Sequence, residues 1–391
     1  MDVQALFQRP KGIAYLDSAA TSLTANAVIA KMDEYYRDYR ANIHRGEHRL
    51  TRRASGEYEA VYAKLAKFFR AGEQEFIATR NATEAVNGVA LGLEWREGDE
   101  VVTTEVEHHS NLLPWLRLRS KGVKVSVVKA DAQGRFTADD FAPLLTKKAR
   151  LAAFTACSNV LAAKVPVKEI AKAAKENGAL VLVDAAQHVG HHAIDLREWH
   201  DVDYLAFSGH KCFGPTGIGA LFHREGAPLE PWFAGGGTIQ EASLEGYKLL
   251  GHRERFEAGT PPIAEWIGLG AALDVIGEIG LRNIEEHEDR LIKEMLKAFD
   301  GAANAALYGP KAAAEKSAAL FAFNVRGVAH HEAAVMFDRL GFALRSGHHC
   351  AQPLTRKLGV EGTVRASLHA YNTEEEARGF GEALAKVAAL G

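Results

Sequence analysis

Lys211 is the residue of this chain whose surroundings point most clearly to chemistry. It follows the apolar run 204–207, which is typical of a strand, and it precedes the glycine-rich stretch 213–219. A lysine that is held rigidly and has lost its hydration has a lowered pKa, and its neutral amine can form a Schiff base with a carbonyl compound. Surface lysines have neither property. The position of Lys211 therefore predicts a Schiff-base lysine at the end of a strand.

Asp184 is the natural companion of such a lysine. It ends the apolar run 179–183, and a carboxylate at the end of a parallel strand lies at the sheet edge where ligands bind in open α/β folds. There it could pair with the protonated ring nitrogen of pyridoxal phosphate and keep that ring an electron sink. Gln187 could donate a hydrogen bond to the ring hydroxyl. The alternative for Asp184 is an ordinary helix N-cap.

Cys350 is the third candidate, and it lies in the polar, glycine-led segment 346–353. Such a loop can bring a thiol into a cleft, and the adjacent histidines favour the thiolate, which attacks sulfur far better than the thiol. Cys157 and Cys212 are more typical of small buried apolar residues. Three cysteines cannot all pair within one chain, which favours a reducing compartment.

These residues belong to motifs that run nearly from end to end of the chain. The motifs are 15–20 (YLDSAA), 44–46 (HRG), 107–111 (EHHSN), 183–187 (VDAAQ), 208–211 (SGHK), 255–261 (RFEAGTP), 345–351 (RSGHHCA) and 365–368 (RASL). In this order they resemble the class V aminotransferase group of pyridoxal-phosphate enzymes, and within it the cysteine desulfurases of the SufS/CsdA type, also called group II. The cysteine-bearing motif separates that type from aminotransferases that share the fold and the cofactor.

The resemblance implies how the cofactor is held. Ala82 and Thr83 open a predicted helix, whose amides and hydroxyl suit a phosphate dianion. The resemblance adds Ser208 and His210 to the phosphate site, and it places Thr260 at the phosphate of the neighbouring subunit, which would make the active unit a homodimer. It also implies that His108 stacks over the ring and moves protons near neutral pH.

The resemblance implies a reaction as well. Arg365, helped by Asn159 and with Arg345 as a further substrate-binding residue, would hold the carboxylate of L-cysteine. Lys211 would move the α-proton, and the Cys350 thiolate would attack the substrate sulfur, leaving L-alanine and a persulfide. A SufE-like or related acceptor protein would collect this sulfur, commonly for iron–sulfur cluster assembly.

Three other functions stay open. Selenocysteine lyase activity would use the same residues and depend less on Cys350, because selenium leaves more readily. A transaminase or other non-sulfur lyase of the same fold would leave Cys350 incidental. A cofactor-binding scaffold for sulfur transfer is the third, although such a protein would have no chemical need for Lys211, Asp184 and Cys350 together.

Some positions depart from the family pattern. Asn81 and Ala82 stand where glycine and threonine are frequent, so one phosphate donor is missing and weaker phosphate affinity is expected. Ala162 replaces a usual glycine and would be strained if the backbone needs a positive φ. Ala156 replaces a frequent histidine. These changes put rate and substrate handling in doubt more than the class of reaction.

The elements that must position these residues alternate as in an α/β fold. Strand-like runs at 100–104, 123–128, 151–155, 180–183 and 204–207 and helical periodicity at 57–69 and 83–92 predict a parallel sheet covered by helices. A long helical stretch from about 269 to 299 and strands near 319–325 and 342–345 predict a smaller α+β domain. We expect fold type I of the pyridoxal-phosphate transferases, with a large domain over 14–268 and a small domain formed by 1–13 and 269–391.

Composition agrees with this interpretation. The chain has 391 residues, 47% of them hydrophobic, and a formal net charge of −3, which argues against a general nucleic-acid surface. Its first residues lack the pattern of a signal peptide and no apolar run approaches a membrane span, so cytoplasm is the expected location. The histidine pairs 191–192, 330–331 and 348–349 have no companion ligands at a recognisable spacing, and no metal is expected.

Overall fold

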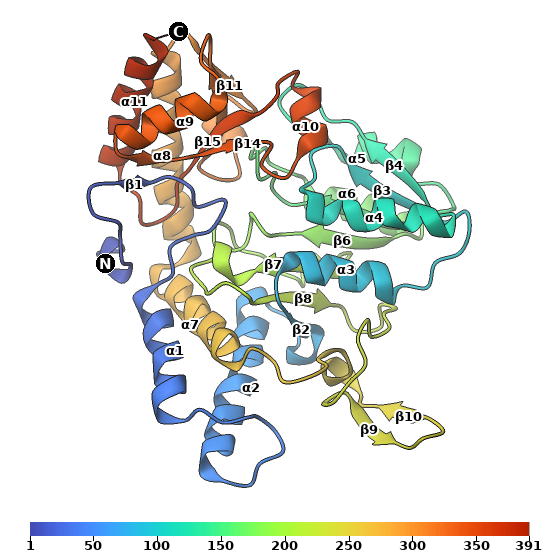
Figure 1. The fold of residues 1–391 in the computed structure, drawn as a ribbon. Coiled ribbons are helices and arrows are strands. Elements are labelled where there is room, and N and C mark those ends of the chain that lie inside the picture. Colours follow the sequence, from blue (N-terminus) through green and yellow to red (C-terminus); the bar gives the residue numbers. More distant parts are fainter. Residues whose placement is uncertain (391) are drawn as a thin grey trace.

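A central seven-stranded sheet forms the larger part of the molecule in a computed structural model that describes residues 1–390 (Figure 1). In spatial order its strands are β2 (Phe76–Thr79), β8 (Gly219–His223), β7 (Tyr204–Ser208), β6 (Leu180–Asp184), β5 (Ala149–Thr155), β3 (Glu100–Thr104) and β4 (Lys124–Val128). Only β8 runs antiparallel to its neighbours. The mainly parallel sheet predicted from the sequence is therefore confirmed.

Helices cover both faces of this sheet. They are α1 (Asn26–Asp38), α2 (Arg49–Phe69), α3 (Ala82–Gly92), α4 (Leu113–Arg117), α5 (Ala138–Phe141), α6 (Val167–Glu176) and α7 (Ile263–Ile279). Alternate residues of β5 show the two layers. Leu151 and Ala153 pack in the apolar cluster that contains α3, whereas Ala152 and Phe154 pack in the cluster that contains α2 and α6. Burial on both faces explains why these strands are nearly continuous apolar runs.

The C-terminal part forms a second, antiparallel sheet with its own core. Its strands lie in the order β11 (Ala305–Tyr308), β12 (Leu320–Val325), β15 (Thr363–Ser367) and β14 (Arg345–Gly347). Helices α8 (Leu281–Asp300), α9 (His330–Arg339) and α11 (Glu374–Ala388) pack in its apolar cluster, which is separate from the clusters of the large sheet. The two cores agree with a two-domain chain, although the exact domain bounds remain a prediction. Gly391 lies outside the described residues.

The long helix expected from about 269 to 299 is in fact two helices. Gly280 has φ +84° and separates α7 from α8. Only glycine adopts such a conformation without steric cost, so the chain can turn there although apolar and helix-forming residues continue on both sides. The sequence pattern predicted the helical content correctly and the continuity wrongly.

The N-terminal segment joins the two sheets. Strand β1 (Ala14–Tyr15) pairs with β13 (Phe342–Ala343), and the following residues run from the C-terminal sheet to the end of β7. Ser18 N–H donates to the carbonyl of Ser367 at 3.2 Å, and Ser22 N–H donates to that of His210 at 2.8 Å. This segment therefore fixes the distance between the end of β15 and the Lys211 turn.

Two smaller features complete the fold. The hairpin β9 (Ile239–Ala242) and β10 (Tyr247–Leu249) extends away from the body of the molecule, and the short helix α10 (Gln352–Lys357) follows Cys350 (Figure 1). Within residues 1–390, none of the helices combines the length and the apolar character needed to cross a bilayer.

Candidate active site

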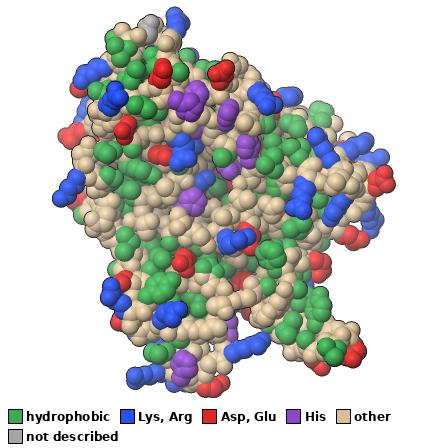
Figure 2. Space-filling model, viewed as in Figure 1, with side chains coloured by type: hydrophobic (Ala, Val, Ile, Leu, Met, Phe, Trp, Pro, Cys, Tyr) green, Lys and Arg blue, Asp and Glu red, His purple; other side chains and the backbone are tan. Residues whose placement is uncertain are grey.

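A cavity of about 310 Å³ lies where the carboxyl ends of the parallel strands meet the second sheet. Almost every predicted site residue lines it. These residues are Ala82, Thr83, His108, Asn159, Asp184, Gln187, Ser208, His210, Lys211, Arg345, Cys350 and Arg365. The structure thus brings together twelve positions that are scattered over most of the sequence. On the face shown in Figure 2, histidine side chains gather in the upper middle, with Lys and Arg side chains among them.

Lys211 lies in the turn that follows β7 and is partly buried. Burial lowers the pKa of its ammonium from 10.5 to about 8, and the nearby Asp184 carboxylate opposes this shift. The turn is tight: a Cβ at Gly214 would come within 2.8 Å of the carbonyl oxygen of Gly209. A rigid backbone and a lowered pKa are the two properties that a Schiff-base lysine needs.

Asp184 is the last residue of β6 and is 4% exposed. One of its carboxylate oxygens accepts the N–H of Ala186 at 2.9 Å. Burial raises the pKa of this carboxyl, while the Ala186 hydrogen bond and the Lys211 charge lower it. None of the ion pairs among residues 1–390 involves Asp184, so a buried carboxylate faces the cavity without a salt-bridge partner. A protonated ring nitrogen would supply that partner.

The start of α3 lies at the end of the cavity where the sequence predicts a phosphate to bind, with one difference from expectation. Asn81 caps the helix by accepting the N–H of Glu84 at 3.0 Å, which gives asparagine a structural role at a position where glycine is frequent in the family. The N–H of Ala82 donates to Ser208 Oγ at 2.9 Å. Thr83 Oγ1 lies 2.7 Å from Ser110 Oγ. Ser110, which the sequence did not single out, therefore adds a hydroxyl to this end of the cavity.

His108 has a defined tautomer. Its Nδ1 accepts the backbone N–H of Ser110 at 3.0 Å, so the ring proton is on Nε2. Burial, followed by the charges of Lys211, His109 and Arg365, lowers its pKa to about 3. The imidazole is therefore neutral at physiological pH, with Nε2–H as a donor and no charge beside Lys211.

Cys350 is the only exposed cysteine among residues 1–390, and its loop is held by several contacts. His349 and Cys350 have φ of +51° and +56°, a left-handed conformation that side chains other than glycine rarely adopt. His109 N–H donates to the carbonyl of Cys350 at 2.7 Å, and Asn159 Nδ2 donates to that of His349 at 2.7 Å. These bonds hold the strained loop at the cavity.

The other two cysteines are buried. Burial raises the pKa of both thiols to about 12. Cys157 lines the cavity wall, whereas Cys212 donates to the carbonyl of Gly209 at 3.3 Å outside the lining. Both agree with the expectation of small buried residues.

Arg365 is the only predicted site residue that reaches into the cavity from the central strand β15. It is 2% exposed, its Nη1 donates to the carbonyl of Asn159 at 2.9 Å, and its Nη2 lies 3.3 Å from Asp17 Oδ1. Arg365 Nε and Asn159 Oδ1 are both buried without a hydrogen-bond partner. Buried polar atoms without a hydrogen-bond partner are costly. A bound carboxylate would accept a hydrogen bond from Arg365 Nε, and a bound amine would donate one to Asn159 Oδ1.

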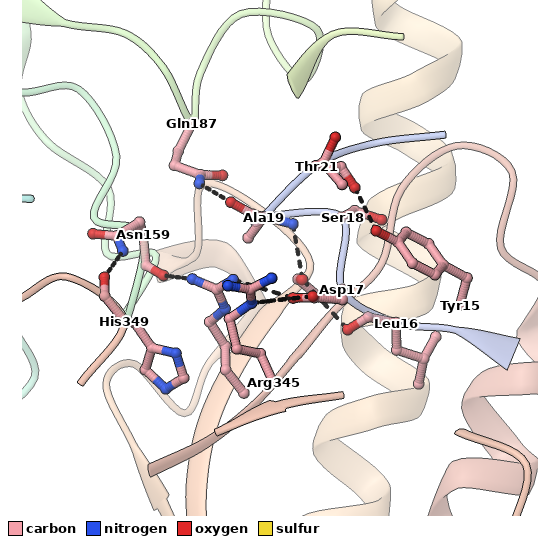
Figure 3. Close-up of polar contacts among 12 residues, drawn as sticks. Tyr15, Leu16, Asp17, Ser18, Ala19, Thr21, Asn159, Gln187, Arg345 and His349 are labelled. Carbon is pink, nitrogen blue, oxygen red and sulfur yellow. Dashed lines mark hydrogen bonds and ion pairs between the residues drawn. The ribbon is translucent and has the colours of Figure 1, made fainter. Parts of the chain in front are cut away.

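Three predicted residues differ from the rest of the site in their contacts, position or backbone conformation. Gln187 Nε2 already donates to the carbonyl of Ala19 at 2.7 Å, so one of its two hydrogens is not free for a ring hydroxyl (Figure 3). Thr260 is exposed and lies outside the Lys211 cavity, in a depression with Glu257 and Gly259. Ala162 has φ +54°, as its replacement of glycine suggested, and its buried methyl packs in a small apolar cluster.

Three residues of the site region were not predicted from the sequence: Ser110 lines the cavity itself, whereas Glu107 and Asp17 act on it through other residues. Glu107 is buried next to His108 and accepts the N–H of Thr155 at 3.0 Å, and its pKa is raised to about 8 by burial. Ser110, Glu107 and Asp17 all lie within quoted motifs, so proximity to His108 and to the 15–20 motif was the available signal. Their hydrogen bonds depend on the fold.

Comparison with known proteins agrees with this geometry. The family described as aminotransferase class-V matches residues 14–380. A protein named "probable cysteine desulfurase" from Pyrococcus abyssi is 45% identical over 374 residues, covering 94% of this chain and 92% of its own length. The apo structure of a cysteine desulfurase from Thermococcus onnurineus NA1 superposes with a TM-score of 0.96 at 42% identity, covering 100% of this chain and 98% of that one.

A second solved structure of a cysteine desulfurase is also similar to this chain. The cysteine desulfurase CsdA from Escherichia coli, solved as an S-sulfonic acid, has a TM-score of 0.91 at 33% identity and covers 99% of this chain and 98% of its own. The strands of both sheets and all the lining residues of the cavity fall within the residues 14–380 that the family matches. This chain belongs to the class V aminotransferase family, with the type I fold of pyridoxal-phosphate enzymes.

Proposed function

We propose that this protein is a pyridoxal-phosphate-dependent cysteine desulfurase, which converts L-cysteine to L-alanine and leaves the sulfur as a persulfide on Cys350. The observation that carries the proposal is the exposed Cys350 thiol on the same cavity as Lys211, Asp184 and Arg365. Relatives that cover more than nine-tenths of the chain bear the same activity in their names.

The cavity residues fit pyridoxal phosphate. The unpaired buried Asp184 suits its ring nitrogen, the partly buried Lys211 suits its carbonyl carbon, and the hydroxyls of Thr83, Ser110 and Ser208 suit its phosphate. When bound, this cofactor supplies an electron sink that allows bonds at the substrate α- and β-carbons to break.

Different residues of the cavity bind the substrate, transfer its α-proton and donate hydrogen bonds. Arg365 binds the α-carboxylate through its unpaired Nε–H, and Asn159 helps to orient the substrate because its unpaired Oδ1 accepts a hydrogen bond from the substrate amine. Lys211, with its pKa of about 8, has an appreciable neutral fraction at neutral pH, and its Nζ can take the α-proton and return it. Neutral His108 adds a hydrogen-bond donor at Nε2 without adding charge.

Cys350 completes the reaction. Its thiolate attacks the substrate sulfur, an S–S bond forms as the C–S bond breaks, and the electron pair of that C–S bond passes to the substrate carbon, which is protonated to L-alanine. L-cysteine and a thiol thus become L-alanine and a persulfide, with no external oxidant. Because the thiol is exposed at the cavity, a second protein can reach the persulfide. We place a sulfur-acceptor protein, and delivery to iron–sulfur cluster assembly, downstream of this step.

The test is to measure alanine and sulfide from L-cysteine and a reductant with cofactor-loaded protein. We expect equal amounts of both products, a loss of at least about 100-fold for Cys350→Ala with its yellow cofactor retained, and nearly unchanged activity for Cys212→Ala, whose thiol is buried outside the cavity lining. Full activity of Cys350→Ala, or no sulfide, would overturn the proposal. In that case L-selenocysteine as substrate and consumption of an added keto acid distinguish a selenocysteine lyase from a transaminase.

A further inference from the structure

Asp17 lies between the two arginines of the carboxylate subsite. Its Oδ2 accepts from Arg345 Nε at 3.1 Å (Figure 3), and its Oδ1 lies 3.3 Å from Arg365 Nη2. Both arginines line the cavity, whereas Asp17 does not. Asp17 therefore acts on a ligand in the cavity through the arginines.

The pairing of the strands makes this carboxylate necessary. Arg345 and Arg365 are directly opposite one another in the antiparallel pair β14–β15, where like charges repel. Burial, with a contribution from Arg345, lowers the pKa of Arg365 to about 10, and Asp17 opposes that shift. Two arginines at paired positions therefore need a counter-charge.

The backbone fixes Asp17 in that place. Ser18 N–H donates to the carbonyl of Ser367, and the N–H groups of Ala20 and Thr21 donate to the carbonyl of Asp17 at 3.0 and 3.3 Å. The side chain of Asp17 is 15% exposed. It is thus a permanent part of the subsite and not a surface charge that can move aside.

The net charge of Asp17, Arg345 and Arg365 together balances the charge of one carboxylate. Arg345 and Arg365 contribute two positive charges and Asp17 one negative charge, which leaves a net +1 (2 − 1). Taking the proposed function as its basis, we infer that Asp17 determines substrate specificity by setting the charge of this subsite, so that amino acids with a single carboxylate bind and those with a second acidic group are rejected. Without Asp17, Arg345 has a free guanidinium at the half-exposed mouth of the cavity, where the side-chain carboxylate of a dicarboxylic amino acid would pair with it.

The test compares cofactor-loaded wild type, Asp17→Asn and the double variant Asp17→Asn/Arg345→Gln. Dissociation constants for L-alanine and L-aspartate are measured from the absorbance change of the bound cofactor. We expect wild type to prefer L-alanine, Asp17→Asn to shift the preference toward L-aspartate by about tenfold, and the double variant to lose that shift. An unchanged ratio in Asp17→Asn, or equal weakening for both amino acids, would show that Asp17 only stabilises the arginines.

A second variant keeps the inference testable if Asp17→Asn does not fold, which thermal unfolding will show. Arg345→Gln alone lowers the net charge of the group to zero, and we expect it to weaken L-aspartate more than L-alanine; equal affinities to those of wild type would overturn the inference. Sulfide release from L-cysteine by the wild type separates the two proposals. If sulfide forms but the ratios do not change, only the specificity role fails, whereas a wild type that releases no sulfide overturns the proposed function itself.

Discussion

At the scale of single residues, one physical cause gives the cavity its reactive groups. Desolvation opposes the charged form of every group, so it lowers the pKa of Lys211 to about 8 and that of His108 to about 3, and it raises the pKa of Asp184. The three shifts have different consequences. They favour a neutral amine at Lys211 and a neutral imidazole at His108, and they make pairing with a cation favourable for the Asp184 carboxylate. The same burial that makes Lys211 useful makes it costly to keep charged.

This cost predicts a pH-dependent effect of Lys211→Met on the cofactor-free protein. The folded pKa lies below the unfolded value of 10.5, so the unfolded state binds more protons between about pH 8 and 10.5, and the wild-type free energy of unfolding rises through that window. Lys211→Met removes the cost of burying this charge. We expect the variant to be more stable than wild type by up to about 3 kcal/mol at pH 7 and the difference to shrink toward pH 10.5.

Urea unfolding at pH 7, 8.5 and 10 measures this difference. Lys311→Met is the matched control, because Lys311 is exposed and keeps its water in the folded state. A constant difference between wild type and Lys211→Met across the three pH values would show that Lys211 is not desolvated in the cofactor-free protein.

At the scale of elements, a buried ionic group ties the site to helix α8. Glu288 of α8 lies 2.9 Å from Nδ1 of His191 and 3.0 Å from Nδ1 of His369, and all three residues are buried. His191 follows the Asp184 turn and His369 follows β15, and their rings stack at 4.1 Å. One carboxylate therefore joins the segment that holds Asp184 to the strand that holds Arg365.

Glu288→Gln should destabilise the protein by about 2–4 kcal/mol, because it leaves two buried imidazoles without their anionic acceptor. The matched control is Glu285→Gln, one turn earlier on α8, whose carboxylate meets His192 at 3.0 Å but is 48% exposed. We expect the control to cost less than about 0.5 kcal/mol. The two imidazoles hold the pKa of Glu288 below its usual range, so its stabilisation is present above the unfolded pKa and is lost as pH falls.

Thermal and urea unfolding of both variants at pH 7 and pH 4 provide the measurement. Equal costs for Glu288→Gln and Glu285→Gln would mean that the buried group contributes no more than a surface pair.

Much of this arrangement was open to prediction from the sequence. Lys211 and Asp184 lie at the ends of apolar runs, and the fold places strand ends at a common edge, so local patterns located both residues. The roles of Asp17 and Glu288 could not be predicted in this way. Asp17 and Arg365 are 348 positions apart, and only the pairing of β14 with β15 and the path of residues 16–22 bring them together.

At the scale of the whole molecule, Thr260 is the predicted site residue that the cavity does not include. It is exposed, and its depression is lined also by His44, Arg45 and Glu257, which belong to family motifs. A residue that serves its own cavity would be expected among its lining residues. We therefore keep the proposal that the protein is a homodimer and that Thr260 completes the phosphate site of the opposite subunit.

Subunit mixing tests that arrangement. Lys211→Ala and Thr260→Val protomers are each expected to be impaired as homodimers at limiting cofactor, because one lacks the reactive amine and the other lacks a phosphate donor. In a heterodimer, one site combines an intact Lys211 with an intact Thr260 from the other subunit, so unfolding and refolding an equal mixture should restore about a quarter of the wild-type sites. If Thr260 served its own subunit, every site in the mixture would carry one of the two defects, and desulfurase activity and cofactor absorbance would stay at the average of the two parents.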